Sequence, residues 1–431
     1  MLIDMGRNAR AASRQMANAA AETKNQALHT IADILDQTHL DIQEANATDI
    51  EIAVSFGMRD ALIDRLTLNE KRLDELSRDL HALAEFPDPV GERFDETVLP
   101  NGMKLRKQRV PLGVLGVIYE SRPNVTIDVS ALAIKTGNSV ILRGGKETIH
   151  TNRTLVQVVQ KALLKCGLPE QAVQFIDSPD RSLMMELLKL HDFVDIIIPR
   201  GGERLHRLCR ENSQIPVITG GIGICHIFVD ESADIEKSLP VIHNAKTQRP
   251  SVCNALDTVL VHRAIAAKML PRIVERLAPA GVTFRAHESA IPFFTGEAEA
   301  SESEEKPIAV LPYSVEPAGP DDFDTEWMSL VLGLKVVDGI EEAIAHTNDH
   351  SMGHSDSILT ENKENAERWV NEVDSSAVYI NASTRFTDGA QFGLGAEVAI
   401  STQRLHARGP MGLRELTTYK WVAEGAYHVR E

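Results

Sequence analysis

Apolar residues recur at helical spacing over the first part of the chain. Residues 11–54 are rich in Ala, Leu, Gln and Glu, and Leu28, Ile31 and Leu35 fall on one face of a helical wheel. The same pattern continues over residues 63–83. These periodicities predict several amphipathic helices before the first strand.

A different pattern follows this helical part. Residues 86–91 read Phe-Pro-Asp-Pro-Val-Gly, and residues 98–103 read Val-Leu-Pro-Asn-Gly-Met, which is typical of a hairpin turn. From Val114 onward, short apolar runs alternate with helical segments, which predicts a parallel sheet with crossover helices on both faces. Gly137 and Gly167 each mark the end of a helix. The expected strands cover residues 114–119, 139–142, 173–176 and 194–198, and the expected helices cover residues 125–135, 150–165 and 181–190.

The alternation continues in the second half of the chain, with one interruption. Residues 258–261 and 330–337 have the apolar, β-branched character of strands, and helices are expected near residues 340–346 and 363–372. The interruption is residues 296–306, an acidic low-complexity segment that is typical of a solvated surface loop.

Length and charge limit the class of protein. A chain of 431 residues exceeds the roughly 250–300 residues at which a single core stops growing, so we expect two or more lobes. The formal net charge of −17 argues against nucleic-acid binding, which needs clustered Lys and Arg. The N-terminus has no apolar leader, and no apolar run approaches the ~18 residues of a membrane span. We therefore expect a soluble, cytoplasmic protein without membrane contact.

The four cysteines lack the spacing of a metal site and favour a reducing compartment. Cys166 and Cys209 lie in expected helices, and Cys225 lies in the apolar run of residues 224–229. These positions favour structural roles for all three, because free cysteine usually packs in the core.

Cys253 has a different setting. It lies in Lys246-Thr-Gln-Arg-Pro-Ser-Val-Cys-Asn254, where Pro250 interrupts regular structure just before an expected strand. Lys246 and Arg249 bring positive charge close in sequence, and a thiol attacks only as the thiolate. The pattern favours a nucleophile positioned on a loop; a buried loop cysteine without chemistry is the alternative.

Glycine pairs follow several of the expected strands. They occur in Arg143-Gly-Gly-Lys146, Pro199-Arg-Gly-Gly-Glu203 and Thr219-Gly-Gly-Ile-Gly223. Such pairs let backbone amides approach a phosphate, but none of them fits Gly-x-Gly-x-x-Gly or the phosphate-loop motif. Each pair alone indicates either a phosphate contact or a tight turn.

Four separated stretches carry a resemblance to one family. They are Ser121-Arg-Pro-Asn-Val-Thr126, Gly220-Gly-Ile-Gly-Ile-Cys-His226, Gln248-Arg-Pro-Ser-Val-Cys-Asn254 and His406-Ala-Arg-Gly-Pro-Met-Gly-Leu413. In this order, over essentially the whole chain, they resemble the signature stretches of the γ-glutamyl phosphate reductases, a family of the aldehyde dehydrogenase superfamily. The resemblance implies an α/β fold of aldehyde dehydrogenase type, with a Rossmann-type cofactor domain, an α/β catalytic domain and a small oligomerisation element.

The resemblance also implies domain boundaries and partners. Residues 1–240 are expected to hold the N-terminal helices and the NADP-binding α/β domain. Residues 241–375 are expected to form the catalytic α/β domain that carries Cys253. Residues 376–431 are expected to return to the cofactor domain and to supply the oligomerisation element. A homo-oligomer is implied, and glutamate 5-kinase, which makes the unstable substrate, is a candidate partner.

Carried over residue by residue, the resemblance makes Cys253 the nucleophile. It makes Asn124 an oxyanion-hole donor, together with the backbone N–H of Cys253. Ile149 stands where many NAD-preferring relatives have a glutamate against the ribose hydroxyls, which favours NADPH/NADP+ as the cofactor. The cofactor-binding residues that the resemblance implies are Lys146 at the adenosine ribose, Gly201 and Gly202 at the pyrophosphate, and Glu326 at the nicotinamide ribose.

One departure from the superfamily indicates the direction of the reaction. Aldehyde-oxidising relatives use a glutamate two positions before a Gly-Gly pair to activate water, and Ile218 stands in that place. Isoleucine cannot act as a general base. The expected reaction is therefore attack of Cys253 on γ-glutamyl phosphate and reduction of the resulting thioester by NADPH to glutamate 5-semialdehyde, the second step of proline biosynthesis.

Recognition of the substrate requires cations for its carboxylate and its phosphate. Arg404 and Arg408 are the candidates for the carboxylate, and Arg249 or Lys246 is the candidate for the phosphate. A surface salt bridge is the alternative interpretation for each arginine.

Three other functions stay open on the sequence. An oxidising aldehyde dehydrogenase for a small aldehyde is disfavoured by Ile218. A cofactor-free thiol hydrolase or acyltransferase with His243 as base is disfavoured by the glycine pairs after strands. A non-catalytic scaffold would have an unreactive Cys253.

Overall fold

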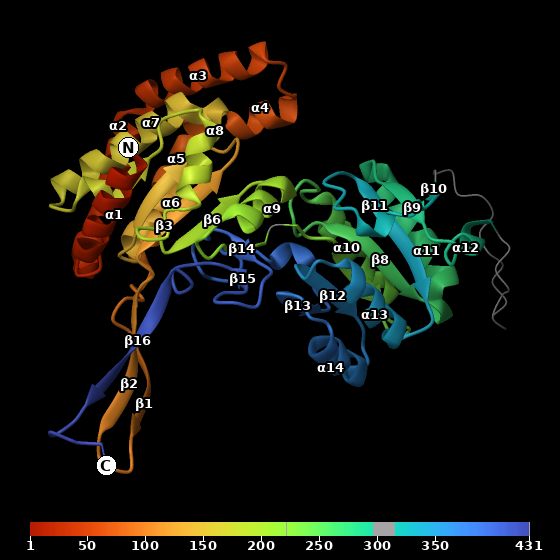
Figure 1. Cartoon of the computed structure of the whole chain (residues 1–431). Coiled ribbons are helices and arrows are strands. Elements are labelled where there is room, and N and C mark those ends of the chain that lie inside the picture. Colours follow the sequence, from red (N-terminus) through yellow and green to blue (C-terminus); the bar gives the residue numbers. More distant parts are fainter. Residues whose placement is uncertain (221, 296–314, 431) are drawn as a thin grey trace. The chain divides into compact units, whose positions relative to one another are not determined.

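The computed structural model describes residues 1–220, 222–295 and 315–430, and the chain divides into two compact units. The first unit comprises Met1–Thr219, Gly393–Ile400 and Pro410–Glu431, and the second comprises Gly220–Phe392 and Ser401–Gly409. The acidic segment of residues 296–306 lies outside the described residues. Figure 1 shows the elements of both units, which we describe one after the other.

Five helices open the first unit, as the apolar spacing predicts. Leu28, Ile31 and Leu35 are fully buried on α2, which packs against α5 and α7. The hydrophobic face that defines the helical wheel is therefore the face that enters the core. The helices are α1 (Leu2–Met16), α2 (Ala21–Gln37), α3 (His39–Ser55), α4 (Asp60–Leu66) and α5 (Glu70–Glu85).

A four-stranded parallel sheet forms the centre of the first unit, with the strand order β5-β4-β3-β6. All residues of β3 and β4 are buried, which agrees with their continuous apolar sequence. Gly137 and Gly167 have φ of 69° and 70°, the left-handed conformation that glycine adopts readily after a helix. The strands are β3 (Val114–Tyr119), β4 (Ser139–Arg143), β5 (Val173–Phe175) and β6 (Ile196–Arg200), and the helices between and after them are α6 (Asn124–Lys135), α7 (Ile149–Lys165), α8 (Arg181–Leu187) and α9 (Glu203–Asn212).

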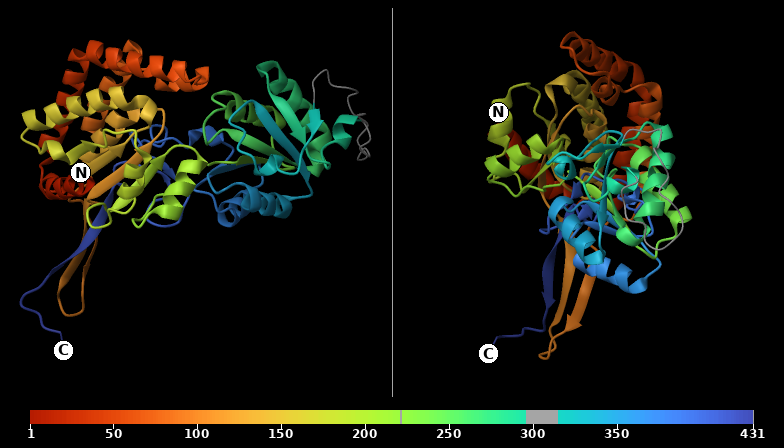
Figure 2. Two further views of the ribbon diagram at one scale, coloured as in Figure 1. Left: turned by 45° about the horizontal axis from the view of Figure 1, so that its top comes forward. Right: turned by 90° about the vertical axis from the view of Figure 1, so that its right-hand side faces the viewer.

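An antiparallel arm completes the first unit. It consists of β1 (Arg93–Val98), β2 (Lys104–Pro111) and β16 (Thr417–Glu424), in the order β1-β2-β16. The predicted hairpin turn at residues 98–103 joins β1 to β2. Figures 1 and 2 show the arm extending away from the rest of the first unit, so both of its faces lie apart from the core of that unit.

The second unit is built on a seven-stranded parallel sheet, in the order β10-β9-β11-β8-β7-β12-β13. Helices α10 and α11 pack on one face of the sheet, and α13 and α14 pack on the other (Figure 2). The strands are β7 (Cys225–Val229), β8 (Leu256–His262), β9 (Thr283–Ala286), β10 (Val315–Pro317), β11 (Val331–Val337), β12 (Ser355–Leu359) and β13 (Ala377–Ile380). The helices are α10 (Ile235–Thr247), α11 (Arg263–Leu277), α12 (Pro292–Thr295), α13 (Ile340–His350) and α14 (Lys363–Glu372).

The division between the units falls after Thr219, earlier than the expected boundary at residue 240. The reason is that β7 pairs with β8 and β12 and thus belongs to the sheet of the second unit. The C-terminal segment is also shared: Gly393–Ile400 and Pro410–Glu431 belong to the first unit, whereas Ser401–Gly409 belongs to the second. Among the described helices, none combines the length and the apolar character that a membrane span requires.

Candidate active site

Several loops of the second unit meet at one edge of its sheet. Cys253 precedes β8, Gly223 precedes β7, His354 precedes β12, and Glu326 lies in the segment before β11. Because these strands run parallel and side by side, the residues before them lie at the same amino edge. Two of the candidate residues, Cys253 and Glu326, are thereby brought to one end of the sheet.

Gly223 lies in close contact with the neighbouring loops at this edge. Its N–H donates to Glu326 Oε1 at 3.2 Å. A Cβ at this position would lie 2.0 Å from the Cys253 carbonyl oxygen and 2.9 Å from His354 Cγ, so only glycine fits here without movement of the neighbouring loops. This glycine therefore packs directly against the Cys253 loop, a requirement that the sequence did not reveal.

Cys253 differs in burial from Cys209 and Cys225, whereas Cys166, at the end of α7, is half-buried as well. Cys253 is half-buried in the turn between α10 and β8, whereas Cys209 and Cys225 are fully buried. Burial raises the pKa of Cys209 to about 12 and raises that of Cys225 well above its usual range, so both stay protonated near neutrality. All four cysteines are free thiols. The buried pair has the structural role that the sequence predicts, and Cys253 is the candidate nucleophile.

The backbone on either side of the thiol is fixed by hydrogen bonds. Cys225 Sγ donates to the Cys253 carbonyl oxygen at 3.3 Å. The buried Asn254 amide donates to the carbonyl oxygen of Thr387 at 2.8 Å, and Thr384 Oγ1 donates back to the Asn254 carbonyl oxygen at 2.8 Å. These bonds tie the turn that carries Cys253 to the segment that follows β13.

The two cations that the sequence singled out beside Cys253 have different surroundings. Arg249 is exposed. Lys246 is fully buried, and its Nζ donates to the Leu256 carbonyl oxygen at 2.8 Å and lies 3.4 Å from Asp257 Oδ1. Burial lowers the pKa of Lys246 and raises that of Asp257 to about 7. The predicted contact of Lys246 with phosphate is therefore wrong: its position on the inner side of α10 directs the ammonium into the core.

A pocket of about 200 Å³ opens beside this turn. The residues that line it come from the end of α10 and from the segment after β13: Asn244, Gln248, Arg385, Phe386, Asp388 and Gln391. Sequence reasoning missed Arg385, because it lies 132 positions after Cys253 in a stretch without a recognisable motif. The signal that could have indicated it is an arginine in the polar run Ser-Thr-Arg-Phe-Thr-Asp after a strand.

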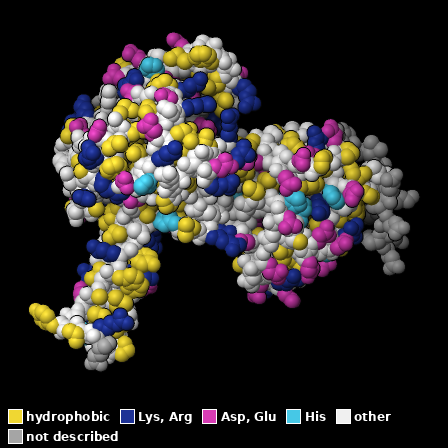
Figure 3. Space-filling model, in the orientation of Figure 1, with side chains coloured by type: hydrophobic (Ala, Val, Ile, Leu, Met, Phe, Trp, Pro, Cys, Tyr) yellow, Lys and Arg dark blue, Asp and Glu magenta, His cyan; other side chains and the backbone are white. Residues whose placement is uncertain are grey.

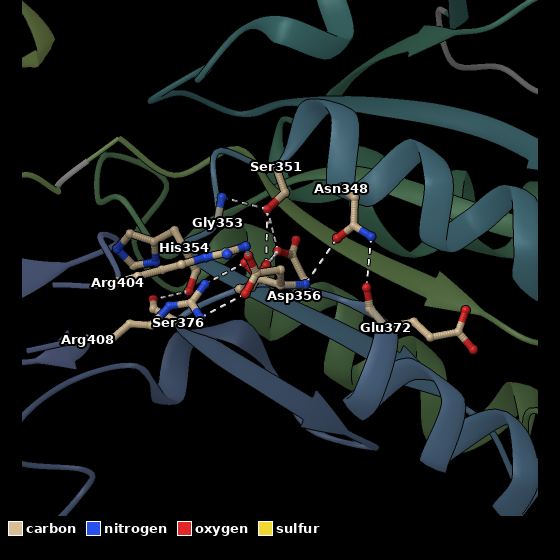
Figure 4. Close-up of polar contacts among 11 residues, drawn as sticks. Asn348, Ser351, Gly353, His354, Asp356, Glu372, Ser376, Arg404 and Arg408 are labelled. Atoms are coloured by element: carbon tan, nitrogen blue, oxygen red, sulfur yellow. Dashed lines mark hydrogen bonds and ion pairs between the residues drawn. The ribbon is translucent and has the colours of Figure 1, made fainter.

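Arg404 and Arg408 lie together on the segment that returns to the second unit, and both reach the turn before β13 (Figure 4). Both form ion pairs with Asp374, and Arg408 also donates to the Asp374 backbone carbonyl at 2.6 Å. The two guanidinium groups hold the pKa of Asp374 below its usual range. The structure thus brings the two predicted carboxylate ligands together and supplies a carboxylate of the protein as their partner.

The other candidate residues lie at the carboxyl edge of the sheet of the first unit, the edge at which doubly wound folds bind ligands. Asn124 opens α6 after β3, and its Nδ2 donates to Asp128 Oδ2 at 2.9 Å, one helical turn later. Ser121 has a φ of 42°, and Glu147 Oε1 accepts hydrogen bonds from its N–H and its hydroxyl, at 2.9 and 2.7 Å. Glu147 thus ties the turn before Asn124 to the glycine turn that carries Lys146.

The two glycine turns of the first unit that carry candidate cofactor residues follow β4 and β6. Lys146 is exposed after β4, and its Nζ lies 5.6 Å from the centre of the exposed Phe56 ring. Gly202 is the N-cap of α9, and a Cβ there would meet nothing within 4 Å, whereas a Cβ at Gly201 would collide with Glu120. The Gly202 N–H donates to Glu120 Oε2 at 3.3 Å, so a carboxylate of the protein meets the N-terminus of α9.

Comparisons with known proteins identify the family. Residues 3–290 and 319–422 match the model of the aldehyde dehydrogenase family. The chain is 55% identical over 429 residues to the gamma-glutamyl phosphate reductase of Vibrio parahaemolyticus, covering 100% of this chain and 99% of that protein. It is 56% identical to the enzyme of the same name from Photobacterium profundum over 426 residues, 99% of each chain.

Solved structures give the same picture. The crystal structure of gamma-glutamyl phosphate reductase from Thermotoga maritima superposes with a TM-score of 0.93 at 47% identity and covers 100% of both chains. An acetylating aldehyde dehydrogenase from Geobacillus thermoglucosidasius shares the fold at 17% identity, with a TM-score of 0.68 and coverage of 100% of this chain and 97% of that one. The chain therefore belongs to the aldehyde dehydrogenase family and, within it, to the γ-glutamyl phosphate reductases.

Proposed function

We propose that this chain reduces γ-L-glutamyl 5-phosphate to L-glutamate 5-semialdehyde with release of phosphate, through a thioester on Cys253. This is the second step of proline biosynthesis from glutamate. The observation that carries the proposal is full-length identity of 55% to enzymes named for this activity, joined to a half-buried cysteine at a structured sheet edge.

The reaction begins with the Cys253 thiolate. Its sulfur attacks the acyl carbon, a C–S bond forms, and the bond to the phosphate oxygen breaks as phosphate leaves. Asn124 and the backbone N–H of Cys253 donate to the oxyanion that develops at the carbonyl oxygen. A bound nicotinamide dinucleotide would supply the hydride to the thioester carbon. The C–S bond then breaks, which regenerates the Cys253 thiolate and releases the semialdehyde.

Ile218 supports the proposal that phosphate, and not water, exchanges with the thioester. Its side chain is buried, and no proton acceptor stands in the place where oxidising relatives have a glutamate. Phosphate is a good leaving group and a good acceptor in the reverse direction, so the thioester exchanges with phosphate rather than with water. An oxidising aldehyde dehydrogenase and a cofactor-free thiol acyltransferase are the alternatives.

For the cofactor we propose NADPH, held by Lys146, Gly201, Gly202 and Glu326. The support is Ile149, the first residue of α7, which offers no carboxylate to a ribose hydroxyl and no repulsion to a 2′-phosphate. Replacement of Ile149 by Glu is expected to raise the KM for NADP+ relative to that for NAD+. An unchanged ratio of the two KM values would remove Ile149 from the cofactor site.

For the substrate we propose that Arg404 and Arg408 meet the α-carboxylate and that Arg249 lies near the phosphate. To contact the substrate, Arg404 and Arg408 must break their ion pairs with Asp374 and bind the α-carboxylate of the substrate instead. Because surface ion pairs contribute only about 0–1 kcal/mol, this exchange costs little. Arg404→Met is expected to raise the KM for the substrate, and an unchanged KM would exclude Arg404 from the site.

We also propose that the chain forms a homo-oligomer, that it is located in the cytoplasm and that it associates with glutamate 5-kinase. The arm carries exposed aromatic residues, Tyr419 and Trp421, and Val98 is also exposed on it. Figure 3 shows hydrophobic side chains along the arm. We propose that the arm supplies the contact between subunits.

The experiment that tests the proposed reaction runs it in reverse. Purified protein is mixed with glutamate 5-semialdehyde, NADP+ and phosphate, and the absorbance of NADPH is followed, with phosphate omitted in a parallel assay and Cys253→Ser as the control. NADPH formation that requires both phosphate and Cys253 supports the proposal. Turnover that persists without phosphate would mean that water resolves the thioester, and the oxidising alternative would then apply.

A further inference from the structure

The pocket beside Cys253 contains a cation that the proposed reaction does not yet use. Arg385 lies in the short helix η5 (Thr384–Phe386) and lines the pocket together with Gln248, Asp388 and three other residues. The backbone of this helix is held by the hydrogen bonds between Asn254 and the segment at Thr384–Thr387. Hydrogen bonds thus connect the segment that carries Arg385 to Asn254, the residue that follows Cys253.

The side chain of Arg385 is fixed but its charge is not neutralised. Its Nε donates to Gln248 Oε1 at 3.0 Å, a neutral amide at the end of α10. Across residues 1–220, 222–295 and 315–430, Arg385 forms no ion pair with a carboxylate, in contrast to Arg404 and Arg408. Asp388, the acidic residue of the pocket, accepts from the backbone N–H groups of Ala390 and Gln391 at 3.0 and 3.2 Å, which fixes its own turn.

The surroundings of this guanidinium favour a bound anion. Burial lowers the pKa of Arg385, and the nearby Arg249 acts in the same direction, whereas negative charge on Cys253 and on Asp388 opposes both. A half-buried cation with a neutral hydrogen-bond partner is stabilised when an anion enters the pocket. A guanidinium is suited to this task because its planar fork matches the oxygen pairs of a carboxylate or a phosphate.

We propose that Arg385 is the oxyanion-binding residue of the substrate pocket, holding either the phosphate or the α-carboxylate of the substrate beside Cys253. This inference rests on the proposed function. It adds Arg385 to the cations proposed above, because Arg385, unlike Arg404 and Arg408, forms no ion pair among the described residues, and Lys246 is directed into the core. The pocket therefore selects an anionic substrate through Arg385, with Gln248 holding the guanidinium in place.

The test uses the full-length protein in the reverse direction, with the KM for phosphate and the KM for glutamate 5-semialdehyde measured separately. Arg385→Gln removes the charge and Arg385→Lys keeps it. The control is Arg272→Gln on α11, which removes an arginine that forms an ion pair with Glu236 on the surface of the same unit. One KM is expected to rise on the order of tenfold to hundredfold in Arg385→Gln, as for the loss of a charge-assisted hydrogen bond, with partial recovery in Arg385→Lys.

The two KM values identify which oxyanion of the substrate Arg385 binds. A rise confined to the KM for phosphate assigns Arg385 to the phosphate, and a rise confined to the KM for the semialdehyde assigns it to the carboxylate. Two unchanged KM values in Arg385→Gln, with or without a fall in kcat, would overturn the inference. If wild-type turnover does not need phosphate, the proposed reaction fails, but the KM for the aldehyde still reports on Arg385.

A second measurement does not depend on turnover. Alkylation of Cys253 by iodoacetamide is followed by mass spectrometry in the presence and absence of inorganic phosphate or glutarate. In the wild type, the anion that occupies the pocket is expected to slow alkylation, and this protection is expected to disappear in Arg385→Gln. Equal protection in the wild type and in Arg385→Gln would contradict the inference, even if Arg385→Gln turns over poorly.

Discussion

At the scale of single residues, the proposed oxyanion hole gives the first prediction. Asn124→Ala removes the proposed side-chain donor of the oxyanion hole. A single preorganised donor contributes about 2.7–4 kcal/mol to the transition state, so kcat is expected to fall by about 10²–10³. The KM for the substrate should change much less, because the oxyanion forms after binding. Steady-state kinetics check this, and a rise in KM with unchanged kcat would move Asn124 from catalysis to binding.

Gly223 makes a second prediction at this scale. A methyl group at this position would lie 2.0 Å from the Cys253 carbonyl oxygen, so Gly223→Ala must displace the Cys253 loop. Overpacking of this kind costs about 1–3 kcal/mol of folding stability, and the displacement should also lower kcat.

The matched control for stability is Gly202→Ala, because a Cβ at Gly202 meets nothing within 4 Å and its φ is −74°. In urea unfolding, the midpoint of Gly223→Ala should be lower than that of the wild type, and the midpoint of Gly202→Ala should be unchanged. Equal midpoints in the two variants would show that the loops tolerate the methyl group.

Asp128 gives stability a dependence on pH. Burial raises the pKa of Asp128 to about 7, and the hydrogen bond from Asn124 opposes this rise. In the unfolded chain the carboxyl has a pKa of about 3.9. The folded state therefore holds the proton more tightly, and this contribution to stability is present below about pH 4 and is lost as pH rises through about 7.

Asp128→Asn removes that dependence. The free energy of unfolding of the wild type, measured with urea and compared with that of Asp128→Asn, is expected to fall as pH rises from about 5 to about 8. A difference between the two proteins that stays constant over this range would show that Asp128 does not bind a proton there.

The sequence predicted some of these residues and not others, for physical reasons. Cys253 could be found because proline, basic residues and a following strand mark its loop. Lys246 was misassigned because its nearness in sequence hides the fact that the inner face of α10 turns it into the core. Arg385 and Gly223 could not be found, because their contacts with the Cys253 loop join segments that are far apart in the chain.

At the scale of elements, the periodicities were reliable because burial enforces them. The inner strands β3, β4, β7 and β8 are buried on both faces and appear as largely apolar runs, whereas the strands β5, β9, β10 and β13 are partly exposed. The predicted strand at residues 258–261 is part of β8, and the predicted helix at residues 363–372 is α14. The pairing of β7 with β8 could not be derived from the sequence, since nothing in a strand's own pattern tells which sheet it joins. The boundary between the units was therefore expected too late.

The arm gives a prediction at the scale of an element. On β16, Trp421 is 56% exposed and Tyr419 is 46% exposed. Large exposed aromatic groups on a sheet are typical of interaction surfaces. Trp421→Asp is expected to shift the protein to smaller species in sedimentation velocity at a fixed concentration, with unchanged secondary structure by circular dichroism. An unchanged sedimentation coefficient would remove the arm from the subunit contact.

At the scale of the whole molecule, two parallel sheets use opposite edges. In the first unit, the candidates Asn124, Lys146 and the pair Gly201 and Gly202 follow the carboxyl ends of β3, β4 and β6, whereas in the second unit Cys253 precedes the amino end of β8. The order of motifs along the chain allowed the family to be named from sequence. The partner groups of each motif could not be derived, because they come from loops that only the folded sheets bring together.

The measurement that tests the central claim most directly is a single turnover without phosphate. The protein is mixed with glutamate 5-semialdehyde and NADP+, and the NADPH formed and the mass of the intact protein are recorded together. The account predicts that NADPH formation stops after one turnover per subunit, with one glutamyl group attached to Cys253 that phosphate then removes. Continued NADPH formation without phosphate, or the absence of an adduct on Cys253, would contradict it.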